Sequence, residues 1–403
     1  MSEEQRPFPA RLPAEKPQDR PISAAMVRLY DQWNPHEDRG NPFYSNFKYS
    51  RVTGIGKEAG VSRRDPSTII KVDGTYYVWY TKRQTEAEPA GLEGQTDTIP
   101  AVDWDLADIW YATSTDGFDW QEQGIAVARA PKGQYGDRSL STPSVLVFGG
   151  KYYLYYQTFT DRWAPKDCVA VSMAWADSPD GPWERLDRPL IEGGAPDDWD
   201  SCAVHDPFPL IYQGKIWLYY KGAPIDKDPR NLIRAQGVAM AEKPEGPFIK
   251  SPLNPVINSG HETCLYPYET GIAAIVSLDG AEKNTVQYAA DGLNFEVKSL
   301  IQVPPVAPGP FCPDLFAGNG DGRGITWGLC QVHPAGTRSD KACFIARFDC
   351  DLSRDVDRPR FKQNNLRFTE ETYFQHIMAL SDDLKEQVLA EQDKVDKDTV
   401  TNG

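Results

Sequence analysis

The stretch Ser62–Tyr80, which reads SRRDPSTIIKVDGTYYVWY, decides the fold of this chain. A short apolar run ends at Asp73-Gly74, and a second run follows that is rich in aromatic and β-branched residues. Two such runs joined by Asp-Gly predict a β-hairpin. The pattern returns in Thr142–Tyr156 (TPSVLVFGGKYYLYY) and in Asp206–Tyr220 (DPFPLIYQGKIWLYY). Each copy carries a small or acidic residue before Pro at the start of its first strand.

A second strand pair follows each hairpin and ends at a turn before an aromatic residue, in the stretches Ile109–Trp120, Val171–Trp183 and Gly237–Phe248. A fourth unit runs from Glu262 to Phe295, and a fifth is expected to start near Phe311–Asp314. The starts lie near residues 65, 142, 206, 262 and 313, so that they are separated by 77, 64, 56 and 51 residues. These lengths suit one four-stranded blade each. We therefore predict an all-β fold, a five-bladed β-propeller.

The ends of the chain differ from this repeat, and we expect three parts. Residues 1–50 form an N-terminal arm and helix, residues 51–360 the propeller, and residues 361–403 an acidic, partly helical segment. In Ile22–Trp33 apolar residues recur on one helical side. A helix of this length is not stable alone. It therefore docks, either on its own domain or on a partner subunit.

Composition excludes several classes of function. The 403 residues carry a formal net charge of −15, which argues against nucleic acid or an anionic membrane surface as a partner. The N-terminus lacks the apolar stretch of a signal peptide, and no window approaches the roughly 18 apolar residues of a membrane span. The seven cysteines are scattered, without a CxxC. We expect mostly buried, reduced thiols in a cytoplasmic protein.

Chemistry is expected where the innermost strands of a propeller converge on the central channel. The residues at these strand starts are Asp65, Thr142, Asp206 and the pair His261-Glu262. Carboxylates gathered around one pocket suit glycoside hydrolysis, in which one group activates water and another protonates the leaving oxygen. An Asp before Pro is also a common turn former, so either aspartate alone could be structural. Recurrence at equivalent positions favours function.

Two motif readings fail. His261-Glu262-Thr263-Cys264-Leu265 begins like the zinc motif HExxH but lacks the second histidine. The glycine-rich run Gly318–Gly324 fits neither a dinucleotide fingerprint nor a P-loop, and is expected to be a surface turn. The sequence therefore predicts no metal ligand.

Several segments resemble glycoside hydrolase family 117, in the order that this family has them. They are Arg63–Ser67, Val78–Lys82, His205–Pro207 and Asn254–Glu262, and Ser23–Arg28 matches the SxAxxR helix motif of the family. The resemblance spans residues 22 to 350. It implies a five-bladed propeller that removes 3,6-anhydro-L-galactose from the non-reducing end of neoagaro-oligosaccharides, by inverting, exo-acting hydrolysis of an α-1,3 linkage. It also implies a homodimer with domain-swapped N-terminal helices, no required cofactor, and in some members a divalent cation in the channel.

The resemblance also implies roles for individual residues. Asp65 is expected to be the general base, Asp206 to orient groups or tune a pKa, and His261 to be the general acid, with Glu262 as its neighbour and the alternative proton donor. Expected sugar contacts are Arg64, Trp110, Thr142, Gln157, His205 and Glu269, and His376 could reach a neighbouring subunit's site. His261 and Glu262 would point to opposite sides of a regular strand, so at least one must lie in the turn before it.

Three alternatives stay open. The first is another propeller glycosidase, and the second is a glycoside phosphorylase, which needs a basic cluster for phosphate. The third is a non-catalytic propeller that binds sugar. The loops Thr85–Asp103 and Pro224–Asn231, which differ from the family pattern, would wall the pocket.

Overall fold

The computed structural model describes residues 13–18, 26–27, 30–31, 40–83, 87–162, 169–224, 235–318, 320–333 and 342–362. Over these residues the protein is almost entirely β-structure, with one short helix, α2 (Gly91–Gly94). Residues 26–27 and 30 are helical, but the rest of the predicted helix Ile22–Trp33 lies outside the described residues, as do the segment 369–394 and His376. No helix in the described part is long and apolar enough to cross a membrane.

The strands fall into successive units of antiparallel sheet. Unit 1 contains β2 (Arg63–Arg64), β3 (Ile70–Val72), β4 (Thr75–Arg83), β5 (Ala107–Ser114) and β6 (Trp120–Val127). Unit 2 contains β7 (Ser139–Phe148), β8 (Lys151–Phe159), β9 (Ala170–Ala176) and β10 (Glu184–Arg185). Unit 3 contains β11 (Ala203–Tyr212), β12 (Lys215–Ala223), β13 (Ala235–Ala241) and β14 (Ile249–Lys250). In each unit, strands adjacent in sequence pair in space, except that β2 and β3 of unit 1 both pair with β4; we count them together as the first strand of that unit.

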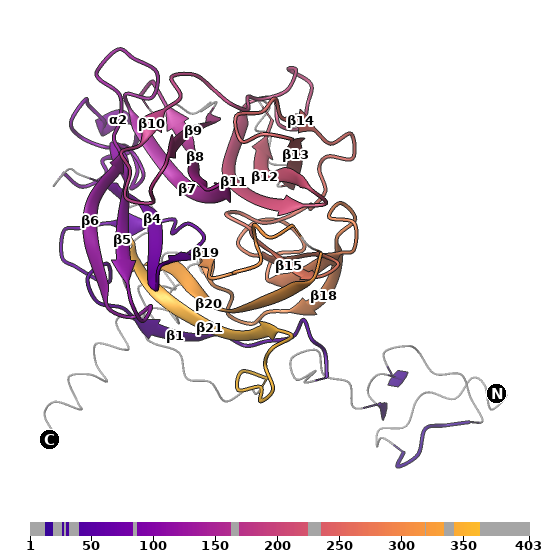
Figure 1. Ribbon diagram of the computed structural model, residues 1–403. Helices are drawn as coiled ribbons and strands as arrows, with labels where there is room; N and C mark the ends of the chain where they lie inside the picture. The colour runs from indigo at the N-terminus through magenta and orange to yellow at the C-terminus, as the bar shows by residue number, and fades with distance from the viewer. Residues whose placement is uncertain are drawn as a thin grey trace, which may run out of the picture.

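The remaining eight strands form one sheet made of two runs. Unit 4 contains β15 (Cys264–Glu269), β16 (Gly271–Val276), β17 (Thr285–Ala289) and β18 (Glu296–Leu300). Unit 5 contains β19 (Val306–Pro310), β20 (Gly322–Val332), β21 (Phe344–Ser353) and β1 (Lys48–Arg51). The two runs are joined by the pairs Tyr268↔Arg323 and Glu269↔Gly322. The units follow one another around a common centre, in a propeller-like arrangement (Figure 1).

The ring is closed by the N-terminal end of the sheet region. Strand β1 pairs with β21 from Lys48↔Asp349 to Arg51↔Ala346, and the two strands lie side by side in Figure 1. Unit 5 also contacts the start of unit 1, because Ile69 N donates to Pro310 O at 2.9 Å. Gly309 permits this approach, since a Cβ there would lie 2.0 Å from Ser67 O. Early and late parts of the chain thus hold each other in place.

The hairpin turns have the backbone that the sequence predicts. Asp73 and Gly74 both have positive φ (47° and 86°), and so do Gln213 and Gly214 (50° and 73°). Two successive positive φ values match the twist of the flanking strands, which is why Asp-Gly and similar pairs are favoured there. The strand pairs predicted on either side of these turns are confirmed.

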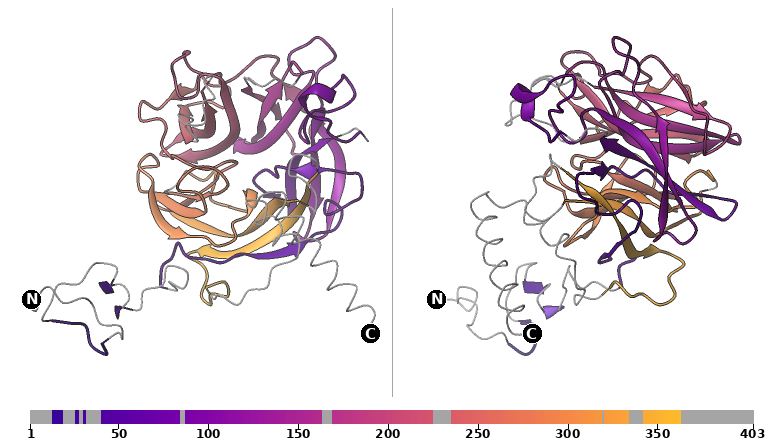
Figure 2. Two further views of the ribbon diagram at one scale, coloured as in Figure 1. Left: turned by 180° about the vertical axis from the view of Figure 1, so that it is seen from behind. Right: turned by 90° about the vertical axis from the view of Figure 1, so that its left-hand side faces the viewer.

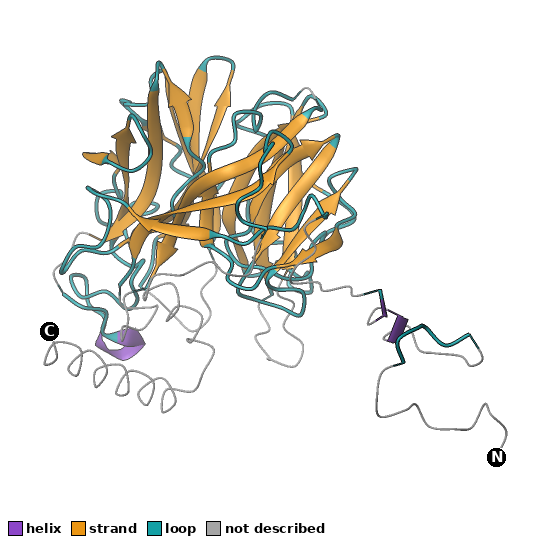
Figure 3. Ribbon diagram, turned by 90° about the horizontal axis from the view of Figure 1, so that it is seen from below, coloured by secondary structure: helices purple, strands orange, loops and turns teal. Residues whose placement is uncertain are grey.

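The apolar core lies between neighbouring units. Trp79 of unit 1 packs with Leu154 of unit 2, and Tyr155 of unit 2 packs with Leu218 of unit 3. Second strands such as β12 are buried over most of their length, whereas the outer strand β6 alternates between buried and exposed positions. Views from the other sides show the sheets packed face to face around the centre (Figures 2 and 3). Burial on both faces explains the continuous aromatic and aliphatic runs in the sequence.

Five described cysteines are free and buried: Cys264, Cys312, Cys330, Cys343 and Cys350. This confirms the prediction of buried structural thiols for those positions. Cys202, by contrast, is disulfide-bonded, and its partner lies outside the described residues. The expectation of reduced thiols is therefore wrong for Cys202.

Candidate active site

One non-glycine residue near the start of each unit has a left-handed backbone. These residues are Asp65 (φ 52°), Thr142 (49°), Asp206 (51°), Glu262 (50°) and Ala307 (47°), and all five line one narrow central pocket. The ladder shifts register at these positions in units 2, 3 and 5, as β-bulges do. A left-handed residue turns its side chain out of the regular pleat, which here directs it toward the shared centre.

The fifth of these residues corrects the predicted repeat. The first strand of unit 5 starts at Val306, so its left-handed residue is Ala307, followed by Pro308. The prediction placed this start near Phe311–Asp314, which follow β19. Ala307 has no polar side chain, so the signal used for the other units was missing.

Side chains from the preceding unit hold three of these residues. Gln331 Oε1 accepts from Asp65 N (3.1 Å), Thr81 Oγ1 from Thr142 N (2.9 Å), and Gln157 Oε1 from Asp206 N (3.3 Å). Each acceptor lies on the second strand of its unit. Gln157 also donates to Thr142 Oγ1 at 3.1 Å. Gln157 and Thr142, expected as sugar contacts, are thus both part of the frame around the pocket.

Asp65 lies buried in this frame beside a guanidinium group. Arg64 Nε lies 3.0 Å from Asp65 Oδ1, and Thr81 Oγ1 donates to Asp65 Oδ2 at 2.8 Å. Arg64 also reaches Glu262 Oε1 (3.6 Å) and Asp103 Oδ2 (3.7 Å), and its guanidinium lies 4.5 Å from the ring centre of Trp104. Burial alone would lower the pKa of Arg64, but the carboxylates around it, Asp65 first, raise that pKa well above its usual range. Arg64 therefore supplies a permanent positive charge under the carboxyl groups.

The carboxyl groups of Glu262 and Asp206 have opposite pKa shifts. Burial, and then the charge of Asp65, raise the pKa of Glu262 well above its ordinary range. Burial alone would also raise the pKa of Asp206, but the imidazoles of His205 and His261 outweigh it and hold that pKa below its ordinary range. One carboxyl therefore favours its protonated form while the other stays ionised.

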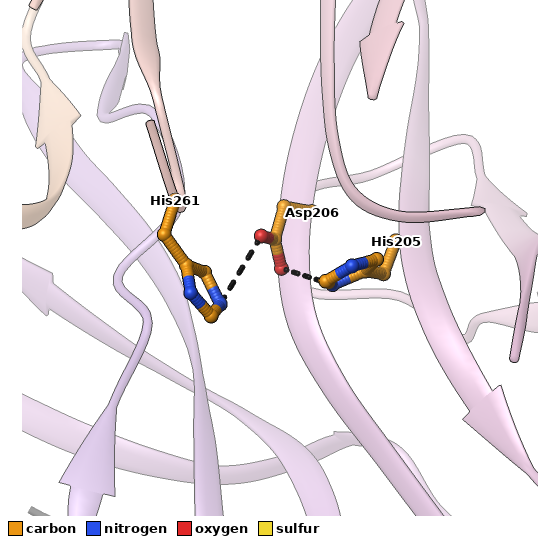
Figure 4. Close-up of side chains that lie close together, drawn as sticks. All are labelled: His205, Asp206 and His261. Carbon is orange, nitrogen blue, oxygen red and sulfur yellow. Dashed lines mark ion pairs between the residues drawn. The ribbon is translucent and has the colours of Figure 1, made fainter. Parts of the chain in front are cut away.

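Asp206 lies between two histidines (Figure 4). Its Oδ1 lies 3.3 Å from His205 Nδ1, and its Oδ2 lies 3.4 Å from His261 Nε2. Burial lowers the pKa of His205 despite the neighbouring Asp206. His261 is more open, with 36% of its side chain exposed, and its Nδ1 lies 3.2 Å from Asp279 Oδ2. His261 and Glu262 both precede β15, which agrees with the prediction that they cannot share a regular strand.

The same three residues are the described group closest to a metal-binding geometry. His205, Asp206 and His261 place one ligand atom each within 4.8 Å of one another. However, both oxygens of Asp206 already contact the two imidazoles, and Asp206 Oδ2 also accepts from Glu262 N at 3.2 Å. The buried ammonium of Lys221 also acts electrostatically on Asp206. With both oxygens of Asp206 engaged in this way, the residues present do not fit a divalent cation in this arrangement.

Two expected sugar contacts do not reach the pocket. Trp110 lies on β5, packs against the core between units 1 and 5, and receives Lys82 Nζ at 3.7 Å from its ring centre. Glu269 is exposed at the far end of β15, about 20 Å of extended chain from Glu262. An aromatic group that does lie beside Arg64 is Trp104, in the loop 96–105, which Arg138 holds through its buried ion pair with Asp105 and a hydrogen bond to Thr96 O.

The predictions also missed Asp103, Lys221 and Asp279. The two aspartates lie in connecting loops, where no repeat marks them. Lys221 did leave a signal in the repeat. It pairs with His205, just as Thr81 pairs with Arg64 and Gln157 with Ser141. Lys221 therefore has the same place on β12 that Thr81 has on β4 and Gln157 on β8.

Comparisons with known proteins agree with this geometry. The family model of glycosyl hydrolases family 43 matches residues 57–236. Xylosidase/arabinosidase 43A of Humicola insolens is 31% identical over 117 residues, which make up 27% of this chain and 34% of that protein, so the chain matches about a third of the length of this curated relative. The catalytic domain of a family 62 α-L-arabinofuranosidase from Coprinopsis cinerea shares the fold at 11% identity, with a TM-score of 0.51, over 77% of this chain and 98% of that one.

A solved family 117 glycoside hydrolase of the marine bacterium Zobellia galactanivorans is much more similar. It is 47% identical, with a TM-score of 0.77, over 83% of this chain and 98% of that chain. The match spans nearly the whole of that enzyme. The chain belongs to glycoside hydrolase family 117.

Proposed function

We propose that this protein is an inverting, exo-acting glycoside hydrolase that releases 3,6-anhydro-L-galactose from the non-reducing end of neoagaro-oligosaccharides, by cleaving the α-1,3 linkage. The observation that carries the hydrolase assignment is the meeting of Asp65, Asp206 and Glu262, from units 1, 3 and 4, in one central pocket. The choice of sugar rests on the family 117 resemblance. We also infer that the five units are the blades of a five-bladed propeller, because each provides one left-handed residue to that pocket.

In the proposed reaction Asp65 takes a proton from the attacking water. The Arg64 guanidinium and the Thr81 hydroxyl hold its carboxylate in place. In inverting hydrolysis the water attacks one face of the sugar while a second group protonates the leaving oxygen on the other. The hydroxyl of the water bonds to the anomeric carbon, the water's other proton goes to Asp65, and the donor's proton goes to the leaving oxygen as the glycosidic bond breaks. The products are a free sugar of inverted configuration and the alcohol that carried it. The proton on Asp65 then returns to the donor through solvent.

His261 is the proton donor that the geometry favours. The carboxyl of Glu262 is nearly buried and hydrogen-bonded to Asp65, so its proton lies beside the proposed base. His261 is partly exposed, with Nε2 next to ionised Asp206. In this proposal Glu262 hydrogen-bonds to Asp65 and lies between the negative charges of Asp65 and Asp206.

Phosphorolysis is less well supported. A phosphorylase needs basic groups that are free to hold its phosphate. The nearby cations Arg64 and Lys221 are paired with carboxylates. Water is therefore the favoured acceptor. We further propose a homodimer joined through the N-terminal helix, on the family resemblance; sedimentation of the full chain tests it.

The test is incubation of purified protein with neoagarobiose, followed by measurement of free anhydrogalactose and, by NMR, of its initial anomer. Wild type should release the sugar, and Asp65→Asn should reduce kcat by about 10²- to 10⁴-fold. Asp177→Asn is the matched control, because Asp177 is exposed on the surface and its ion pair among the described residues is with exposed Lys151. Release of other sugars alone would exclude the proposed substrate. Binding without turnover of any sugar would indicate a non-catalytic propeller.

A further inference from the structure

The frame around the pocket has one break in its repeat. The second strands of units 1, 2 and 5 present Thr81, Gln157 and Gln331, and each accepts the N–H of the left-handed residue in the next unit. Unit 3 presents Lys221 at this place, in register with His205. An ammonium group has no acceptor. The N–H of Glu262 is therefore donated to Asp206 Oδ2 instead, at 3.2 Å.

Lys221 brings a charge into a buried position, where it needs a partner. Its side chain is 3% exposed, and its Nζ lies 2.6 Å from Asp279 Oδ2. The same oxygen of Asp279 lies 3.2 Å from His261 Nδ1. Burial would raise the pKa of Asp279, but the contacts with His261 and Lys221 hold it below its ordinary range. Asp279 is thus an ionised acceptor shared by a lysine and a histidine.

The loop that carries Asp279 also holds the backbone of His261. His261 N donates to Ser277 O at 3.0 Å, and Gly260 N donates to Asp279 O at 2.7 Å. The ring and the main chain of His261 are therefore tied to the same three residues, 277–279. In an imidazole whose Nδ1–H donates to a carboxylate, the remaining nitrogen Nε2 is presented in a fixed direction. Here Nε2 is on the side of Asp206.

We propose that Asp279, held by Lys221, is a positioning residue for His261: it fixes the imidazole with Nδ1–H toward the loop and Nε2 toward the glycosidic oxygen. The inference rests on the proposed function, in which His261 donates the proton to the leaving group. In this arrangement Lys221 provides the fixed positive charge that keeps Asp279 ionised and in place. This role explains why unit 3 has a lysine where units 1, 2 and 5 have Thr81, Gln157 and Gln331.

The first experiment compares two leaving groups on the same anhydro sugar. Asp279→Asn should lower kcat on the oligosaccharide by about 10- to 100-fold with KM little changed, since a carboxylate behind a functional histidine acts through that histidine. On a nitrophenyl glycoside, whose leaving group needs little protonation, the loss should stay within about threefold. His261→Ala should show the same pattern more strongly, and Asp177→Asn should resemble wild type.

A second variant separates positioning from folding. Asp279→Asn leaves the buried ammonium of Lys221 without its carboxylate, so it is expected to lower Tm. Adding Lys221→Gln removes that charge and installs the residue found at the same place in units 2 and 5. The double variant should regain Tm while kcat on the oligosaccharide stays low. If kcat recovers together with Tm, or if Asp279→Asn lowers kcat equally on both substrates, Asp279 is structural and the inference is overturned.

A third readout does not depend on turnover. The chain has five histidines, so the imidazole of His261 can be assigned in NMR spectra of histidine-labelled protein by comparison with His261→Ala. In the neutral imidazole that remains once Nε2 has given up its proton, wild type should show a single tautomer of His261 with the proton on Nδ1, and the double variant Asp279→Ala/Lys221→Gln a mixture of tautomers. The same form in both proteins would overturn the inference. Absence of turnover with every glycoside would instead refute the proposed function, and the NMR result would still decide whether Asp279 orients His261.

Discussion

Replacement of Arg64 by methionine tests whether the carboxyl groups of the pocket depend on one buried cation. The guanidinium lies 3.0 Å from Asp65, 3.6 Å from Glu262 and 3.7 Å from Asp103, and these side chains are all at most 9% exposed. With an effective dielectric constant near 20, Coulomb's law gives about 5 kcal/mol for each charged contact at these distances. Most of this is offset by the loss of hydration on burial, whereas removal of one partner alone costs about 3–5 kcal/mol. Methionine nearly conserves the apolar volume, so the change tests the charge.

We therefore expect Arg64→Met to lower the free energy of unfolding by about 3–5 kcal/mol at pH 7, which corresponds to a fall in Tm of roughly 10 °C. Urea unfolding followed by tryptophan fluorescence measures it. Arg354→Met is the control, since the pair Arg354–Asp321 is 35% and 66% exposed and should contribute less than about 1 kcal/mol. Adding Asp103→Leu to Arg64→Met should recover part of the loss. A loss no larger than that of the control would refute the reasoning.

Three further changes test the electrostatics and the placement of aromatic groups. Burial and Asp65 raise the pKa of Glu262, so the stability it contributes is present at low pH and is lost as pH rises through the raised pKa; urea unfolding between pH 5 and 9 should show Glu262→Gln becoming more stable relative to wild type as pH rises. Burial alone would raise the pKa of Glu122, but hydrogen bonds with Arg63, Lys82 and Tyr80 lower it to about 2. Glu122→Gln should therefore destabilise the protein at pH 7, and the difference in unfolding free energy from wild type should shrink as pH falls toward 3. A difference that does not change with pH would mean that these ion pairs are not formed. Steady-state kinetics should show that Trp104→Leu raises KM about tenfold, whereas Trp110→Leu lowers Tm without changing KM; the reverse would place the sugar on Trp110.

The sequence by itself determined the local architecture and the first carboxylates. Hairpins are short-range structures, so the Asp73-Gly74 turn and its two copies could be recognised from residues a few positions apart. The repeat then marked Asp65, Asp206 and Glu262, because a polar residue stood at the same place in each unit. Where that residue was alanine, at Ala307, the start of the fifth unit was placed about six residues too late.

Only the tertiary structure decided how these residues act. Asp279, Lys221 and His261 come from a loop, a second strand and a strand start in two different units, and no rule of local spacing joins them. The same holds for Trp104, which reaches Arg64 through a loop held by Arg138 and Asp105. The opposite pKa shifts of Glu262 and Asp206 arise from burial and from charges on other units. Ionisation depends on what surrounds a group in space, and closure of the ring sets those surroundings.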